Sequence, residues 1–288
     1  MRPASVSPPR SRVKGRGTSV SDPVPTVARA GYTAAGATES ARASRLWWDR
    51  ESQAYLRDHG AFLGDDRLVW CPEGLDEDDV GLLGDVAGRT VLEVGCGAAQ
   101  GTRWAARHGA RAVGVDLSRG MLRRAAELDE RLGTSAAVVQ ADAARLPLAA
   151  GVVDVAFSAF GALPFVADAG AVLAEVRRVL LDGGRWVFSV THPVRWAFPD
   201  DPGPGGLVAD RSYFDRTPYT ERAEDGTVLY AEHHRTLGDW VRALVSSGFT
   251  LLDVVEPEWP QDNRQVWGGW SPTRGAILPG TAIFVTQV

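Results

Sequence analysis

The chain has 288 residues, 44% of them hydrophobic, which is enough for one large domain or for one domain with additions. Its formal net charge of −5 excludes a general electrostatic attraction to nucleic acid or to an anionic membrane. There is no run of about 18 apolar residues, so no transmembrane span is expected.

Residues 1–45 differ in composition from the rest of the chain. They are rich in Pro, Ser, Gly, Ala and Thr and carry eight basic residues against two acidic ones. Such a segment buries too little apolar surface to offset its ordering entropy, so we expect a disordered, inert basic tail. The alternatives are a basic arm for nucleic acid or a targeting signal, although the apolar core of a secretory signal is missing.

Residues 46–88 predict a helical N-terminal cap. Trp47, Trp48, Tyr55 and Leu56 recur at loosely helical spacing. The acidic run at 76–79 then favours the start of a second, short helix, because acidic side chains stabilise a helix N-terminus.

From residue 90 to residue 190, apolar runs typical of strands alternate with segments typical of helices. Continuous apolar runs indicate strands that are buried on both faces, as in a parallel sheet covered by helices. The sequence predicts strands at 90–94, 111–115, 136–140, 152–157 and 184–190, and helices at about 100–108, 119–132 and 168–181. This pattern predicts a doubly wound α/β fold, whose ligands bind at the carboxyl ends of the strands.

The remainder adds an insertion and two further strands. Residues 192–235 form a long insertion after strand five, in which Asp225-Gly226 separates two runs and predicts a β-hairpin. A helix at 236–247, a strand at 250–255, a Trp-rich loop at 257–278 and a strand at 279–287 follow. The whole predicts a mostly parallel, seven-stranded, Rossmann-like sheet at 89–288, with a helical cap before it.

The segment 91–101, Val-Leu-Glu-Val-Gly-Cys-Gly-Ala-Ala-Gln-Gly, is the most informative in the chain. A strand ends near Glu93 and leads into a turn in which Gly95, Gly97 and Gly101 are expected to let the backbone approach a ligand. The spacing Gly-x-Gly-x-x-x-Gly differs from the Gly-x-Gly-x-x-Gly of dinucleotide-binding folds.

Two carboxylates after the next strands favour an adenosine-bearing ligand. Asp116 ends the second strand, where a carboxylate accepts hydrogen bonds from ribose hydroxyls, and Asp142 follows the third strand, where it can accept from an adenine amine. Met121 can lie on a purine face. Glu93 would repel a diphosphate and attract an amino acid's ammonium group.

In these residues the chain resembles the class I S-adenosylmethionine-dependent methyltransferases, of the small-molecule, methyltransferase type 11-like kind. The matching pieces span about 100 residues and include Val91–Gly97, Gly114–Ser118, Met121, Ala141–Ala143, Asp154-Val155 and Glu175–Leu180. The resemblance implies the cofactor S-adenosylmethionine, the product S-adenosylhomocysteine, and a contact set: Tyr55, Glu93, Gly95, Cys96, Gly97, Gly101, Asp116, Leu117, Met121, Asp142, Ala143, Ser158 and Phe160.

Three histidines of the insertion are candidate general bases. His192 follows strand five, and the neighbours His233 and His234 end the hairpin, where at most one of them can face the site. A base is needed only if the acceptor loses a proton as it attacks. A structural role for each histidine is the alternative. The aromatic residues of the insertion and the Trp-rich loop are expected either to cover an organic acceptor or simply to pack on the sheet.

The leading hypothesis is therefore methyl transfer to a small organic molecule, with O, N or C as the acceptor atom. The segment after strand four has no carboxylate before Asp168, so no metal is expected, and an acidic chain is a poor partner for nucleic acid. The alternatives are a non-catalytic cofactor- or nucleotide-binding regulatory protein and an NAD-dependent oxidoreductase. Cys71 and Cys96 are not expected to form a disulfide, which fits a cytoplasmic protein. The single lysine, Lys14, indicates a GC-rich bacterial genome.

Overall fold

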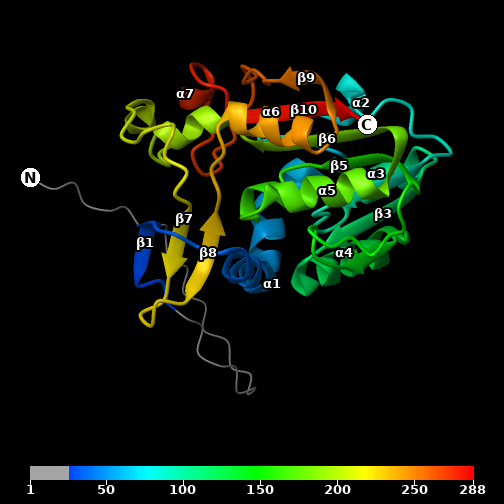
Figure 1. Ribbon diagram of the computed structural model, residues 1–288, viewed down its shortest axis with the longest axis horizontal. Helices are drawn as coiled ribbons and strands as arrows, with labels where there is room; N and C mark the ends of the chain where they lie inside the picture. The colour runs from blue at the N-terminus through cyan, green and yellow to red at the C-terminus, as the bar shows by residue number, and fades with distance from the viewer. Residues whose placement is uncertain (1–25) are drawn as a thin grey trace, which may run out of the picture.

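A seven-stranded sheet forms the centre of the molecule, in the order β4-β3-β2-β5-β6-β10-β9 (Figure 1). The structure is a computed structural model and describes residues 26–288. β2 to β6 pair in parallel, whereas β10 is antiparallel to both β6 and β9. The strands are β2 (Thr90–Val94), β3 (Arg111–Asp116), β4 (Val138–Gln140), β5 (Val153–Ser158), β6 (Leu180–Thr191), β9 (Thr250–Val255) and β10 (Thr281–Gln287). The predicted doubly wound, mostly parallel seven-stranded fold is confirmed.

Both faces of this sheet are covered, and alternate residues of each strand supply the two faces. Leu92 and Val94 belong to the core under α5 (Ala169–Val179) and α6 (Leu237–Ser246). Val91 belongs to the opposite core, which includes Trp104 and Ala105 of α3 (Gln100–Arg107). This alternation explains why the strands are continuously apolar in sequence.

The strand order reverses between β2 and β5, and the loops that follow these two strands meet there. A Cβ at Gly95, whose φ is +72°, would lie 2.6 Å from the backbone nitrogen of Ala162. A Cβ at Gly161 would lie 2.7 Å from the carbonyl oxygen of Gly95. The two loops therefore approach backbone to backbone at the topological switch point, where sheets of this kind bind ligands.

A second, three-stranded antiparallel sheet lies apart from the large one, with α1 beside it (Figure 1). Its order is β1-β7-β8, and its strands are β1 (Arg29–Tyr32), β7 (Tyr219–Arg222) and β8 (Val228–Glu232). The predicted hairpin is thus present, and a strand from the N-terminal segment extends it.

The expectation of a disordered tail over residues 1–45 is wrong for its second part. β1 pairs with β7 through residues 29–32, and the helix α1 (Ala37–Leu63) begins eight residues before position 45. Ala43 is buried against Val228 and Ala231 of β8. Small side chains that indicate disorder in sequence here allow close packing. Residues 1–25 of the expected tail lie outside the part that the structure describes.

The remaining elements are short, apart from α4 (Arg119–Leu132), which begins where the Ser118 hydroxyl accepts a hydrogen bond from Met121 N. The short elements are α2 (Glu77–Val80), α7 (Pro272–Gly275) and the 3₁₀ turns η1 (Leu163–Phe165), η2 (Pro193–Ala197) and η3 (Pro204–Leu207). Between residues 26 and 288, no helix has the length and apolar character needed to cross a membrane.

Candidate functional site

A cavity of about 300 Å³ lies at the carboxyl ends of β2, β3, β4 and β5, and α1 covers it. Its floor comes from the loops that follow these strands, and its roof comes from one face of α1. Most of the expected contact residues line it: Tyr55, Glu93, Gly95, Cys96, Gly97, Gly101, Asp116, Leu117, Met121, Asp142, Ala143 and Phe160. Ser158 does not line this cavity.

Glu93 is a buried carboxylic acid at the end of β2. It is 6% exposed, and the Thr102 hydroxyl of α3 donates a 2.5 Å hydrogen bond to its Oε2. Burial raises the pKa of Glu93 to about 8, although the bond from Thr102 opposes this shift. A cationic group placed in the cavity would favour the ionised form of this side chain.

Asp116 links the end of β3 to the glycine-rich loop. Its Oδ2 accepts a 2.8 Å hydrogen bond from Gly97 N, and its Oδ1 accepts a 2.7 Å bond from Ser118 N. Burial raises the pKa of Asp116 to about 6, and these two N–H groups limit the rise. A carboxylate has further lone pairs, so Asp116 can also accept from ligand hydroxyls in the cavity.

Asp142 and Ala143 follow β4 and offer an acceptor beside a donor. Asp142 Oδ1 accepts a 2.9 Å hydrogen bond from Ala144 N, which orients the carboxylate. In the described part of the chain, the Ala143 N–H has no hydrogen-bond partner. This pairing suits the amine and the ring nitrogen of an adenine.

The glycines of the loop have different roles. Gly97, with φ +52°, lines the cavity, and a Cβ there would lie 3.0 Å from Met121 Cε. A Cβ at Gly101 would instead lie 2.6 Å from Glu93 Oε1 and 2.8 Å from Phe157. All three glycines line the cavity; in addition, Gly101 makes room for the Glu93 side chain, and Gly95 makes room for the loop after β5.

Ser158, the last residue of β5, and Phe160 just after it were expected to contact the cofactor. The Ser158 hydroxyl is fully buried and has no hydrogen-bond partner within residues 26–288. Phe160 lines the cavity with a φ of +54°, a strained value for a bulky side chain, and its N–H donates to Ser189 Oγ at 2.9 Å.

Helix α1 is attached above the cavity by a carboxylate. Asp49 Oδ1 accepts hydrogen bonds from Gly120 N at 2.7 Å and from the Ser118 hydroxyl at 2.8 Å, at the N-terminus of α4. A Cβ at Gly120 would lie 2.6 Å from the Asp49 carbonyl oxygen, so only glycine permits this approach of the two helices. Tyr55 is thereby held in the cavity wall, where burial raises its pKa.

Arg67 also lines the cavity, and sequence reasoning missed it. It is the cavity's only cationic side chain among the described residues. Asp76, which is 5% exposed, accepts a 2.8 Å hydrogen bond from its Nε and lies 2.6 Å from one of its terminal nitrogens. No local pattern marks Arg67, because its position depends on the fold of residues 64–76 against the glycine-rich loop.

None of the three candidate histidines lines the cavity. His192 is 7% exposed; its Nδ1 accepts from Val194 N, and its Nε2 lies 2.8 Å from Glu256 Oε1. Desolvation lowers its pKa, although Glu256 opposes this effect. The expectation that the three histidines act as bases is therefore wrong for this cavity. His192 instead joins the ends of β6 and β9.

The hairpin histidines also bind other parts of the protein. His233 Nε2 lies 2.9 Å from the Ser40 hydroxyl of α1, and burial lowers the pKa of His233 to about 4. His234 Nε2 lies 2.7 Å from the Tyr213 carbonyl oxygen. Both side chains therefore hold the small sheet to its neighbours.

Comparisons with known proteins agree with this geometry. Residues 92–188 match the family model of a methyltransferase domain. A search of curated proteins gave no significant match. The matched residues run from β2 to β6 and include the glycine-rich loop.

Several solved structures are similar over most of the chain. An S-adenosylmethionine-dependent methyltransferase from Mesorhizobium loti is 28% identical, with a TM-score of 0.59, over 76% of this chain and 100% of that one. A putative enzyme of the same kind from Listeria monocytogenes is 25% identical, with a TM-score of 0.58, and the match covers 73% of this chain and 96% of that one. The Burkholderia thailandensis 1,6-didemethyltoxoflavin-N1-methyltransferase, solved with its substrate and S-adenosylhomocysteine, is 18% identical, with a TM-score of 0.57, over 91% and 93%.

Proposed function

This chain belongs to the class I S-adenosylmethionine-dependent methyltransferases, and we propose that it transfers the methyl group of that cofactor to a small organic molecule. The observation that carries the proposal is the placement of Glu93, Asp116 and Asp142 in one cavity, at the ends of three strands. Its cofactor is S-adenosylmethionine.

The residues of the cavity fit the adenosine part of this cofactor. We assign the ribose hydroxyls to Asp116, and the adenine to Asp142 and to the unpartnered N–H of Ala143. Leu117 and Met121 supply apolar surface for the purine. The open backbone at Gly97 leaves space that a Cβ would fill.

The charges of the cavity fit the amino-acid part. Glu93 would accept the ammonium group, and Arg67, oriented by Asp76, would bind the carboxylate. Bringing a cation to Glu93 also offsets the cost of ionising a buried carboxylic acid. The ammonium and carboxylate groups of the amino acid would thus each meet a side chain of opposite charge, from two different segments of the chain.

The bound cofactor supplies a sulfonium methyl group that is already activated for displacement. The protein therefore has to position an acceptor and exclude water, and α1 contributes by covering the cavity. Such positioning can contribute roughly 7–11 kcal/mol to catalysis. None of the three histidines is placed to act as a base there, so proton removal is not assigned to them.

A small molecule is the acceptor that we favour. The Burkholderia enzyme acts on 1,6-didemethyltoxoflavin, which is consistent with such an acceptor on this fold, and the acidic chain disfavours nucleic acid. Helix α1 covers part of the cavity, which disfavours a macromolecular acceptor. The absence of a catalytic metal and a cytoplasmic location remain predictions; the free, buried Cys71 and Cys96 are compatible with a reducing compartment.

Calorimetric titration tests the proposal against its alternatives. We expect S-adenosylhomocysteine to bind at micromolar concentration and Asp116→Ala to weaken it at least tenfold, with Asp58→Ala, on the exposed side of α1, as the control. Binding of NADH in its place would overturn the proposal. If S-adenosylhomocysteine binds but no methyl transfer to extracts of the producing cell is found with a labelled donor, the regulatory alternative is favoured.

A further inference from the structure

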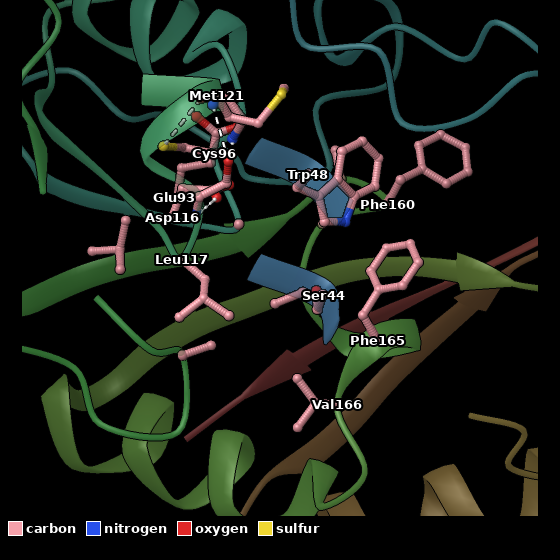
Figure 2. Close-up of a pocket in the computed structure, with 18 of the residues that line it drawn as sticks. Ser44, Trp48, Glu93, Cys96, Asp116, Leu117, Met121, Phe160, Phe165 and Val166 are labelled. Atoms are coloured by element: carbon pink, nitrogen blue, oxygen red, sulfur yellow. Dashed lines mark hydrogen bonds between the residues drawn. The ribbon is translucent and has the colours of Figure 1, made fainter. Parts of the chain in front are cut away.

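The cavity is divided into a charged half and an aromatic half. Figure 2 shows Glu93, Cys96, Asp116, Leu117 and Met121 together on one side, and Trp48, Phe160, Phe165 and Val166 on the other. Ser44 lies between the two groups, on α1. Glu93, Asp116 and Met121, which we assign to the cofactor, are on the first side, so the second side remains for the acceptor.

The aromatic half offers apolar surface almost exclusively. Trp48 and Phe165 are 5.5 Å apart between ring centroids and meet edge to face. Further lining residues from α1 and from the segment after β5 are small or aliphatic: Ala37, Ala41, Ala159, Ala162, Val166 and Ala167. Surfaces of this composition hold flat, apolar rings by burial and stacking.

Phe160 is kept in this wall at a cost in backbone energy. Its φ of +54° is a strained conformation for a bulky residue. The bond from its N–H to Ser189 and the contacts of its ring with Trp267 and Trp270, 6.0 and 6.1 Å between centroids, hold it there. Strain of this kind concentrates at ligand sites, which supports a binding role for the aromatic half.

Among the described residues that line this side, the only charged one is Asp168, which is exposed and already caps α5 by accepting from Ala171 N at 3.1 Å. Arg235 lies behind the lining, where its guanidinium donates to the carbonyl oxygens of Val166 and Ala167. An anionic acceptor would lose its hydration there without gaining a cationic partner, since Arg67 lies with the cofactor residues beside Asp76. The acidic groups of the charged half would repel it further. Anions are therefore poor acceptors.

Among the described lining residues of the aromatic half, the only side chain that could remove a proton is Asp168, and its Oδ1 is engaged as the N-cap of α5. The histidines lie outside the cavity, and Tyr55 is a phenol that burial keeps protonated. The attacking atom must therefore carry a free lone pair at neutral pH. Among apolar flat molecules, an aromatic ring nitrogen meets that requirement, whereas an alkyl amine or a phenol must first lose a proton.

We propose that the acceptor is a neutral nitrogen heteroaromatic ring, held between Trp48, Phe160 and Phe165 and oriented by the hydroxyl of Ser44. Ser44 lines the cavity between the two groups, so its hydroxyl is placed to bind a polar edge of the ring. In the reaction the nitrogen lone pair forms a bond to the methyl carbon while the carbon–sulfur bond breaks. Sulfur keeps the bonding pair, and the positive charge passes to the N-methyl product. This inference rests on the proposed methyl transfer.

Ligand-observed NMR with a matched pair of probes tests it. Binding of quinoline and of quinoline-4-carboxylate to the full chain is measured with and without S-adenosylhomocysteine. We expect quinoline to bind at least tenfold more tightly than the carboxylate. Equal or tighter binding of the carboxylate would overturn the proposal.

Two variants locate the binding. Phe165→Ala and Ser44→Ala should weaken the binding of quinoline at least fivefold, while the affinity for S-adenosylhomocysteine stays within twofold. Phe214→Ala is the control and should change neither affinity, because Phe214 is 71% exposed. Unchanged quinoline binding in both cavity variants would contradict the assignment. If the unaltered chain does not bind S-adenosylhomocysteine, the proposed function fails, and the quinoline pair measured alone then decides only whether the aromatic half prefers a neutral ring to an anionic one.

Discussion

The Thr102 hydroxyl donates a 2.5 Å hydrogen bond to Glu93 Oε2 across the space left by Gly101. This bond partly stabilises a carboxylate that is 6% exposed, yet the pKa of Glu93 still rises to about 8 because burial dominates. Three residues of the segment 93–102 thus prepare a proton-binding group at the centre of the cavity, and two pH effects are expected from it.

The first effect is on stability. The pKa of Glu93 is about 8 in the folded protein against an ordinary value of 4.5, so the folded state keeps a proton that the unfolded chain has lost between these pH values. The free energy of unfolding should therefore fall as pH rises from 4.5 to 8, by up to about 1.4 kcal/mol per pH unit from this group. Urea denaturation at several pH values should show that the free energy of unfolding falls less steeply with pH in Glu93→Gln than in the native chain. An identical slope in both proteins would contradict the burial of an ionisable group here.

The second effect is on ligand binding. If Glu93 must ionise to accept the ammonium group of S-adenosylhomocysteine, binding near pH 7 releases about one proton. Asp116, with a pKa of about 6, is already mostly ionised at pH 7 and contributes little. Calorimetry in two buffers of different ionisation enthalpy should detect this proton for the native chain and none for Glu93→Gln. Proton uptake on binding would exclude the proposed partner of Glu93.

Arg67 should contribute to affinity only through the carboxylate of the ligand. Arg67→Gln should lower the affinity for S-adenosylhomocysteine by tenfold or more, since a charge-assisted hydrogen bond contributes about 1.5–3 kcal/mol. Methylthioadenosine, which lacks the amino acid, should bind both proteins within twofold. Arg57→Gln is the control, because Arg57 is 68% exposed and pairs with Asp58. Equal losses for both ligands would indicate that Arg67 supports the fold instead.

Asp49 should couple α1 to the cavity. Asp49→Ala removes the acceptor for Gly120 N and the Ser118 hydroxyl, which we expect to lower the free energy of unfolding by about 1 kcal/mol, as for a lost helix cap. Affinity for S-adenosylhomocysteine should fall as well, because α1 forms the roof. Asp58→Ala, on the same helix, should change neither quantity. A stability loss without any loss of affinity would separate the position of α1 from ligand binding.

His192 should be structural. His192→Ala leaves Val194 N without its acceptor and Glu256 without its partner, so unfolding should become easier by about 1–3 kcal/mol. Affinity for S-adenosylhomocysteine should stay within twofold, since His192 does not line the cavity. A double-mutant cycle with Glu256→Ala measures the coupling between the two side chains. A change in the pH profile of methyl transfer, without a loss of stability, would return His192 to the list of bases.

The three carboxylates of the cofactor half could be predicted because each lies at or just after the end of its own strand. Glu93 and Asp116 lie at the ends of β2 and β3, Asp142 follows β4 by two residues, and parallel strands bring their carboxyl ends to one edge. A residue's place at the end of a predicted strand thus also gives its place in the cavity, so local sequence patterns are enough to predict it.

The acceptor half, the role of Arg67 and the position of His192 could not be predicted in this way. Ser44 and Ala37 belong to a stretch whose small residues indicate disorder, and only packing against β8 makes it part of a helix. Arg67 depends on its pairing with Asp76, which a strand pattern does not encode. His192 occupies a promising position after β6, but Val194 and Glu256 decide where its ring points.

The pairing of β1 with β7 has a practical consequence for protein engineering. A shortened protein that starts at residue 46, where composition alone suggests a boundary, would lose β1 and the first turns of α1. β7 would then become an open sheet edge, a template for association with other chains. We expect such a truncation to aggregate and to lose a third of the roof-forming helix, whereas one that starts at residue 26 keeps both.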